Sequence, residues 1–235
     1  MLSLINAGDG HQQQNGRWGV PALRIREQLI SCRWAFAVIV VVSAIPLCAA
    51  VLLHSWKGMD YGALVRDPVV VANAHVWTGF ISQLGIFFWA GAAAVCFLAG
   101  AALTRIPVYR EIRRFLMASG ALTLFLGLDD VFLFHEEVFP GYLGIPESLL
   151  YAVYVGWVSW YLFRFRFVIL DTEYLMLLGA LSGFALSVLS DLLNGPFLYE
   201  DGVKLIGLVA WLTYYSRTSY FAIRRAIAGE DRSPG

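Results

Sequence analysis

Charged residues are scarce in this sequence. Asp, Glu, Lys and Arg make up 14% of its 235 residues, whereas hydrophobic residues make up 59%. A soluble globular domain usually carries about 25% charged and about 45–50% apolar residues. The shortage therefore excludes a disordered chain, a fibrous repeat and an ordinary soluble domain, and it predicts a polytopic membrane protein. Basic and acidic residues number 17 each, and this balance argues against a nucleic-acid partner.

Cysteine pairs and catalytic fingerprints are missing as well. Cys48 and Cys96 fall at different depths of the segments that contain them, so no disulfide between them is expected. The sequence has no CxxC pair, no phosphate-binding loop, no GxSxG elbow and no dinucleotide fingerprint. The search for a function must therefore turn to polar residues inside the apolar segments.

Six apolar segments are expected to cross the membrane as helices. A span needs about 20 apolar residues to cover a hydrocarbon core of about 30 Å. The expected spans are 34–53, 76–103, a third that starts at 115 and includes Asp129 and Asp130, 147–163, 173–193 and 200–223. Outside this 34–223 domain, residues 1–33 are expected to form a polar cytoplasmic tail and residues 224–235 a short one. Residues 21–32 are expected either to lie on the membrane surface as an amphipathic helix or to form a solvated linker.

The distribution of basic residues sets the expected orientation. All but three of the 17 Lys and Arg residues lie on the side of the two termini, and the exceptions are Lys57, Arg66 and Lys204. Cytoplasmic loops carry an excess of basic residues. The predicted fold is therefore all-α, a polytopic transmembrane bundle of six helices with both termini inside. We expect such a chain to be an integral protein of a plasma or inner membrane, with its site facing the non-cytoplasmic side.

The third segment is the most informative because its charge-free part is too short to span. Residues 115–128 cover about 21 Å of a core of about 30 Å, at about 1.5 Å per residue. Asp129 and Asp130 should therefore lie inside the membrane, where a carboxylate costs at least a few kcal/mol unless it is protonated, paired or hydrated. On this basis Asp130→Asn is expected to be tolerated, because it removes a costly charge.

Helical geometry predicts which side chains accompany the two aspartates. At about 100° per residue, Glu136 lies above Asp129 and Glu137 lies above Asp130 on one polar arc. In an ideal helix His135 does not lie with both aspartates, unless the helix unwinds near its outer end. The polar arc should face the bundle rather than lipid.

The fifth and sixth segments offer partners for this arc. Small residues at four-residue steps, among them Gly179 and Gly183, lead to Asp191 and permit close helix approach. Lys204 is the only outer cation close to a predicted core, and its expected partners are Glu200, Asp191 or an aspartate of the third segment. The candidate catalytic group comprises Asp129, Asp130, Glu136, Glu137, Asp191, Glu200 and Lys204, and Tyr151 and Tyr154 are expected to line the cavity.

Three histidines near the outer side are candidate metal ligands. His54, His75 and His135 are expected at about the same depth, and together with carboxylates they would suit zinc or iron. No HxxxH or HExxH spacing supports this interpretation, and histidines at membrane interfaces need no ligand role. A divalent metal cofactor is therefore left open at this point.

Three classes of function fit these residues. The first is a membrane-embedded enzyme, a hydrolase or another acid–base catalyst, that acts on a lipid or isoprenoid from a pocket on the non-cytoplasmic side. The second is a proton- or cation-linked transporter or small channel, although few polar residues are expected toward the inner side. The third is an accessory membrane subunit. A one-sided pocket favours the enzyme, with membrane lipids and a hydrophobic small molecule as partners.

Overall fold

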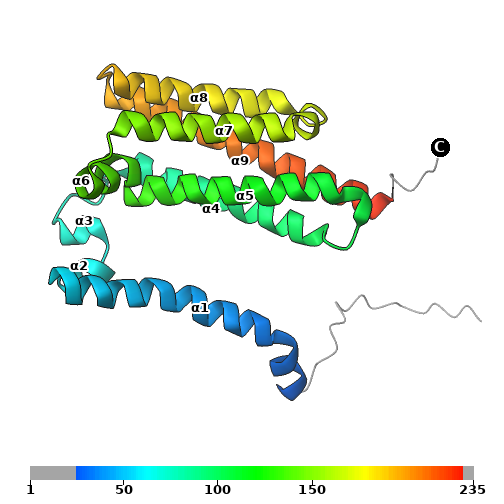
Figure 1. Cartoon of the computed structure of the whole chain (residues 1–235), viewed down its shortest axis with the longest axis horizontal. Helices are drawn as coiled ribbons and strands as arrows, with labels where there is room; N and C mark the ends of the chain where they lie inside the picture. The colour runs from blue at the N-terminus through cyan, green and yellow to red at the C-terminus, as the bar shows by residue number, and fades with distance from the viewer. Residues whose placement is uncertain (1–24, 230–235) are drawn as a thin grey trace, which may run out of the picture. The chain divides into compact units, whose positions relative to one another are not determined.

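The computed structural model describes residues 25–229, and all regular structure within that range is helical (Figure 1). The helices are α1 (Ile25–Lys57), α2 (Tyr61–Val65), α3 (Pro68–Val71), α4 (Phe80–Ala102), α5 (Arg110–Phe132), α6 (Phe139–Leu143), α7 (Glu147–Leu170), α8 (Tyr174–Leu192) and α9 (Phe197–Ala228). Two short turns, the 3₁₀ turn η1 (Pro107–Tyr109) and the π-helical turn η2 (Phe134–Val138), flank α5. The all-α prediction is confirmed, while the parts of the expected tails at 1–24 and 230–235 lie outside the described residues.

Five of these helices are long and apolar enough to cross a membrane. The candidate spans are Cys32–Lys57, Phe80–Ala102, Pro107–Phe132, Glu147–Leu170 and Tyr174–Leu192. They lie at the positions of the first five predicted spans. Helix α9 coincides with the sixth predicted segment and has 32 residues, but it is not among the helices found apolar enough to cross a membrane.

The chain divides after Val76 into two compact units. In the first unit, α1 carries exposed apolar side chains from Ile30 to Trp56 and continues through Pro46. A proline inside a helix removes one backbone hydrogen bond, which membrane-spanning helices tolerate. Helix α3 begins at Pro68, and the carboxylate of Asp67 caps it by accepting a 2.8 Å hydrogen bond from the Val69 N–H.

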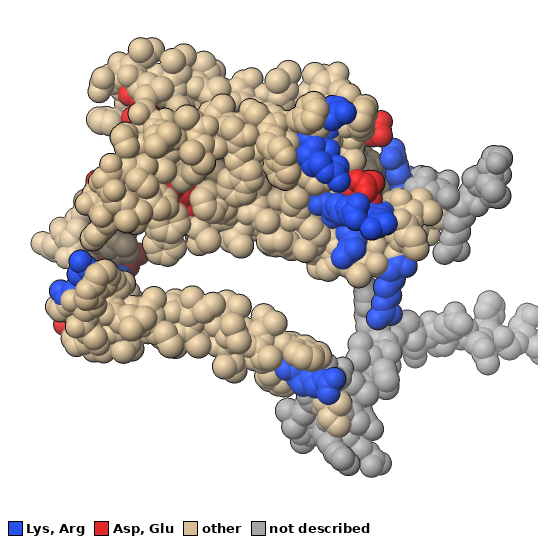
Figure 2. All heavy atoms as spheres, viewed as in Figure 1, with Lys and Arg blue, Asp and Glu red and all other residues tan. Residues whose placement is uncertain are grey.

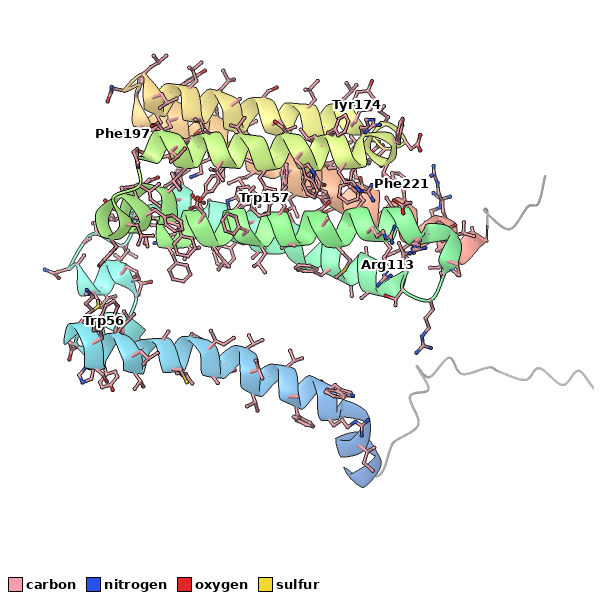
Figure 3. The ribbon with its side chains drawn as sticks, in the orientation of Figure 1. Trp56, Arg113, Trp157, Tyr174, Phe197 and Phe221 are labelled. Carbon is pink, nitrogen blue, oxygen red and sulfur yellow. The ribbon has the colours of Figure 1, made fainter. Side chains whose placement is uncertain are left out.

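The second unit contains α4 to α9 and holds the buried core. Helix α9 packs against α4 and α8, and α4 also packs against α5. Helix α7 meets α5 through aromatic side chains; Trp157 lies with its ring centroid 4.9 Å from that of Phe125 (Figure 3). At the centre, Trp211 of α9 is 1% exposed and packs edge-on against Trp89 of α4.

Charge separates the second unit into two ends. Nearly all of its cations gather at one end, where Figure 2 shows them as a cluster. We call this the arginine-rich end, and it comprises Arg105, Arg110, Arg113, Arg114, Arg164, Arg166, Arg217, Arg224 and Arg225. We call the opposite end the acidic end, and it comprises Asp129, Asp130, Glu136, Glu137, Glu147, Asp191, Glu200 and Asp201, with Lys204 among them. The separation follows from antiparallel helices joined by short turns, which bring alternate connections to the same end (Figure 1).

Hydroxyl groups buried between the two ends bond to one another. The Ser119 hydroxyl lies 2.6 Å from that of Tyr161, which in turn lies 2.9 Å from that of Tyr215. Closer to the arginine-rich end, the hydroxyls of Thr172 and Tyr214 lie 2.8 Å apart. Tyrosines, which count as apolar by composition, thus supply hydroxyl groups in the core.

Candidate functional site

Two neighbouring aspartates at the acidic end of α5 point toward different helices. Consecutive residues of an α-helix lie about 100° apart around its axis. Asp129 therefore faces α7 and the η2 turn, whereas Asp130 faces α4 and α9. The side chains of Asp129 and Asp130 are only 7% and 10% exposed, so both carboxylates depend on partners from the protein.

The carboxylate of Asp129 accepts three hydrogen bonds. Its Oδ2 lies 2.6 Å from Nδ1 of His135, and its Oδ1 accepts the backbone N–H of the same residue at 3.1 Å. The Tyr154 hydroxyl of α7 donates to Oδ1 at 2.9 Å. These bonds hold the imidazole in one orientation, with its other nitrogen, Nε2, 3.4 Å from Oε1 of Glu136.

A break in the helix brings His135 back to Asp129. Leu133 has a φ of 51°, in the left-handed region that residues with a side chain rarely occupy, and its N–H closes the last bond of α5 on the Asp129 carbonyl. The chain then continues as η2, so His135 does not follow the course of an ideal helix. The unwinding named above as the exception is therefore present, and it places His135 with Asp129. Unusual backbone of this kind concentrates at functional sites.

The carboxylate of Asp130 forms an ion pair with Lys204 of α9. Its Oδ1 accepts from the Lys204 ammonium, and its Oδ2 accepts the indole N–H of Trp89 at 3.2 Å. Of the three alternative partners expected for Lys204, the structure shows an aspartate of the third segment, and within residues 25–229 no such bond joins Lys204 to Glu200 or Asp191. A cavity of about 10 Å³ adjoins the pair, which is room for about one water molecule.

The remaining predicted acids differ in how closely they join this network. The Tyr151 hydroxyl donates to Asp191 at 3.0 Å, and the Tyr151 ring lies 5.2 Å from the His135 ring, so Asp191 connects to the network through α7. Glu200 lies close enough to Asp191 for the two carboxylates to interact electrostatically. Glu137 has no ion pair or side-chain hydrogen bond within the described part of the chain, so the structure does not bring it into the network.

His135 carries a positive charge over the ordinary pH range. It lies beyond the end of the candidate span Pro107–Phe132. Burial alone would lower the pKa of the imidazole, but the hydrogen bonds and negative charges of Asp129 and Glu136 outweigh burial and raise the pKa to about 9. The same contact with His135 lowers the pKa of Glu136. The two aspartates thus have one cation each, His135 and Lys204.

This charge should make the stability of the folded protein fall at high pH. The folded pKa of His135, about 9, lies above the ordinary 6.5, so its contribution is fully present below about pH 6.5 and is lost as the pH rises through about 9. The contribution is on the order of 3 kcal/mol. Thermal unfolding in detergent should show this loss between about pH 6 and pH 10.

Two variants test whether His135 causes this pH dependence: His135→Asn removes the group, and His54→Gln is the control. His135→Asn should flatten the pH dependence, whereas His54→Gln should keep it, because His54 bonds the Met59 carbonyl and stacks on Tyr61 without meeting a carboxylate. An equal pH dependence in wild type and His135→Asn would show that another group is responsible.

The histidines do not form a metal site in the described residues. Within residues 25–229, no three His, Cys, Asp or Glu side chains are arranged to hold a metal ion. His135 directs Nδ1 at Asp129, and His54 directs Nδ1 at the Met59 carbonyl. The zinc or iron interpretation therefore has no support from the geometry.

Sequence reasoning missed two hydrogen-bond donors of the site. Trp89 lies in the middle of a charge-free segment, and its indole N–H bonds Asp130. A buried indole N–H needs an acceptor, and this requirement could have pointed to a polar partner for Trp89. Tyr154 was expected only as part of a cavity wall, yet its hydroxyl bonds Asp129. His135 was considered only as a metal ligand, because nothing in the sequence around Leu133 signals the helix break.

The fold and the site together define a helical membrane protein with a buried, ion-paired polar network at one end of its larger unit. The chain belongs to the family described as Domain of unknown function (DUF8692), whose model matches residues 33–218. No curated protein and no solved structure matches the chain.

Proposed function

We propose that the protein is a membrane enzyme that transfers a proton to or from a lipid-soluble substrate, with His135 as the acid–base group. The observation that carries this proposal is the triple hydrogen bonding of Asp129, which fixes the orientation of the imidazole. A carboxylate that holds Nδ1 leaves Nε2 of the same ring for proton transfer. Because His135 is protonated near neutral pH, it acts first as an acid.

The other charged groups fit supporting roles in this proposal. Asp130 and Lys204 form their own ion pair, so His135 is the cation that compensates Asp129, and the negative charge of Asp129 favours return of a proton to the ring after transfer. Glu136 lies at the free nitrogen of the imidazole and is 47% exposed, so it offers a route for returning a proton from water. The site then works as a proton donor for hydrolysis or for a proton-initiated rearrangement of a lipid or isoprenoid.

The proposal includes an orientation in the membrane. We infer that α9 is a sixth span, because its 32 residues reach about 48 Å and two of its cations are paired, the partly buried Lys204 with Asp130 and the exposed Arg217 with Glu173. The excess of basic residues then assigns the arginine-rich end to the cytoplasm and the acidic end to the opposite side. Reporter fusions at Gly235 and near Pro140 should report opposite sides; the same side for both would contradict this topology.

The enzyme proposal can be tested without knowing the substrate. Purified protein in vesicles is incubated in D₂O with the total lipid extract of the membrane that contains it, and mass spectrometry searches for lipids that gain deuterium or change mass. His135→Asn should reduce the conversion by about a hundredfold or more, the usual contribution of a positioned acid–base group. His54→Gln should leave it unchanged. The absence of any conversion by the wild type would contradict the proposal.

Proton-linked transport is a second candidate, and one observation favours it. The bonded hydroxyls of Ser119, Tyr161 and Tyr215 lie between the acidic end and the arginine-rich end, as a proton path would need. In vesicles with a pH-sensitive dye inside, transport predicts proton movement that Tyr161→Phe reduces and Tyr220→Phe, at an exposed position, does not. Lipid conversion without proton movement would favour the enzyme.

A further inference from the structure

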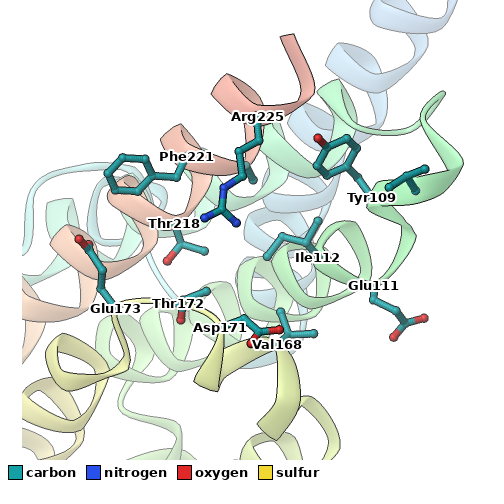
Figure 4. Close-up of a pocket in the computed structure, with 12 residues that line it drawn as sticks. Tyr109, Glu111, Ile112, Val168, Asp171, Thr172, Glu173, Thr218, Phe221 and Arg225 are labelled. Carbon is teal, nitrogen blue, oxygen red and sulfur yellow. The ribbon is translucent and has the colours of Figure 1, made fainter. Parts of the chain in front are cut away.

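A second cavity lies at the arginine-rich end of the second unit and shares no residue with the polar network (Figure 4). The start of α5 with η1, the turn between α7 and α8, and the last turns of α9 enclose it. Its volume is about 560 Å³, within the roughly 300–1,000 Å³ typical of small-molecule sites. The cavity is therefore large enough for a ligand, unlike the water-sized space beside Asp130.

Two of the four charged side chains that line this cavity are already neutralised. Glu173 accepts two hydrogen bonds from the Arg217 guanidinium, each 2.5 Å long. Glu111 accepts a 2.7 Å bond from Arg114. In Figure 4 the carboxylates of Glu111 and Glu173 lie at the edges of the site, on opposite sides. Neither acid is therefore a free group for a ligand.

The other two charged side chains, Asp171 and Arg225, are both exposed to solvent. Among residues 25–229, neither makes an ion pair or a side-chain hydrogen bond, and they do not pair with each other although both line the cavity. Arg225 extends its guanidinium into the middle of the lining residues (Figure 4). Asp171 caps the C-terminal end of α7, where the helix dipole is negative and a carboxylate is unfavourable without a cation. The cavity thus offers one cation and one anion.

The rest of the lining is largely apolar. Ile112 of α5, Val168 of α7 and Phe221 of α9 are among its members. An apolar wall beside a charged pair suits a molecule with a polar head and a hydrocarbon tail. In a membrane-spanning unit, the arginine-rich end lies at the level of the lipid headgroups, where basic pockets between helices bind phosphate.

We propose that this cavity binds a phosphoethanolamine headgroup, carried by a phospholipid or by its water-soluble glycerol ester. The guanidinium of Arg225 binds the phosphate through charge-assisted hydrogen bonds, and the carboxylate of Asp171 accepts N–H groups of the primary ammonium. The headgroup has one negative and one positive charge, which match these two side chains.

Other phospholipid headgroups fit less well. An anionic phosphoglycerol headgroup leaves Asp171 without a cation. A choline headgroup has no N–H to donate and is recognised through aromatic faces. The lining has two aromatic residues, Phe221 and Tyr109. The Phe221 ring is already engaged by the Arg217 guanidinium at 5.3 Å, and one further ring does not make an aromatic cage.

Native mass spectrometry of the full chain in detergent tests the proposal. The protein is titrated with phosphatidylethanolamine, phosphatidylcholine and phosphatidylglycerol that carry identical acyl chains. Phosphatidylethanolamine should bind about tenfold more tightly than either of the other two, the effect of one charged hydrogen bond. If glycerophosphoethanolamine displaces the lipid, the headgroup alone is sufficient for binding. If phosphatidylethanolamine binds tightly and glycerophosphoethanolamine does not displace it, the acyl chains contribute to binding in the same cavity. Equal binding of the three lipids would overturn the proposal.

Three variants assign the binding to the named residues. Arg225→Gln should weaken phosphatidylethanolamine binding by about tenfold, and Asp171→Asn should abolish the preference over phosphatidylcholine. Arg224→Gln removes a neighbouring exposed arginine that does not line the cavity, and it should leave binding unchanged. Thermal unfolding without lipid checks that each variant is folded. If Arg224→Gln and Arg225→Gln weaken phosphatidylethanolamine binding equally, the lipid responds only to the total positive charge of this end. That result would overturn the proposed site.

Discussion

Replacing Gly183 with leucine should prevent α8 and α9 from packing and should greatly reduce the yield of folded protein. A Cβ at Gly183 would lie 2.8 Å from Cα of Gly207 and 2.9 Å from the carbonyl oxygen of Val203. Both are backbone atoms, so the helices themselves must move apart. Overpacking usually costs about 1–3 kcal/mol, and we expect a loss of about 3 kcal/mol or more here because no side chain can rotate away.

Gly179→Leu is the matched control on the same helix. A Cβ at Gly179 meets no atom within 4 Å, so the larger side chain has open space and should leave the melting temperature unchanged or raise it. The sequence pattern grouped these two glycines in one small-residue stripe, but the structure uses only Gly183 for close approach. Thermal unfolding of both variants in detergent gives the comparison. Equal destabilisation of the two would contradict the packing argument.

Lys204→Met should also destabilise the protein strongly, because it leaves the Asp130 carboxylate buried without its cation. Removing one partner of a buried ion pair costs about 3–5 kcal/mol, and we expect about 3 kcal/mol because the Lys204 side chain is 33% exposed. Asp130→Asn should now also be unfavourable, since it leaves Lys204 without its partner. The ion pair therefore reverses the expectation, drawn from burial alone, that Asp130→Asn is tolerated.

The double variant Lys204→Met/Asp130→Asn separates pairing from other effects. Removing both charges should recover most of the stability that Lys204→Met loses, because no uncompensated charge remains. Chemical or thermal unfolding of the four proteins forms a double-mutant cycle. Losses that simply add would show that the pair does not couple α5 to α9.

The fold was largely predictable because apolar segments of spanning length leave few alternatives. The first five predicted spans match candidate spans, and the sixth segment matches α9. The contact of Lys204 with Asp130 was predictable as one of three alternatives, because a carboxylate at that depth needs a partner and few cations lie near it, but the sequence did not choose among Glu200, Asp191 and the two aspartates. The catalytic role of these residues stays a prediction.

The part of the site that sequence could not predict depends on one residue with an unusual backbone conformation. Leu133 adopts the left-handed region although neither glycine nor proline marks the position. Its conformation follows from tertiary contacts, because η2 then brings both the N–H and the ring of His135 to Asp129. Periodicity places residues on an ideal helix and has no means of anticipating such a break.

The pairing of α5 with α9 has a consequence for how the chain is made. Asp130 precedes Lys204 by 74 residues, so during synthesis α5 must enter the membrane before its cation exists. Helix α9 in turn is not among the five helices that are apolar enough to span on their own. In the six-span topology proposed above, its insertion would therefore depend on α4, α5 and α8 already being present, because they bury its aromatic side chains and neutralise Lys204.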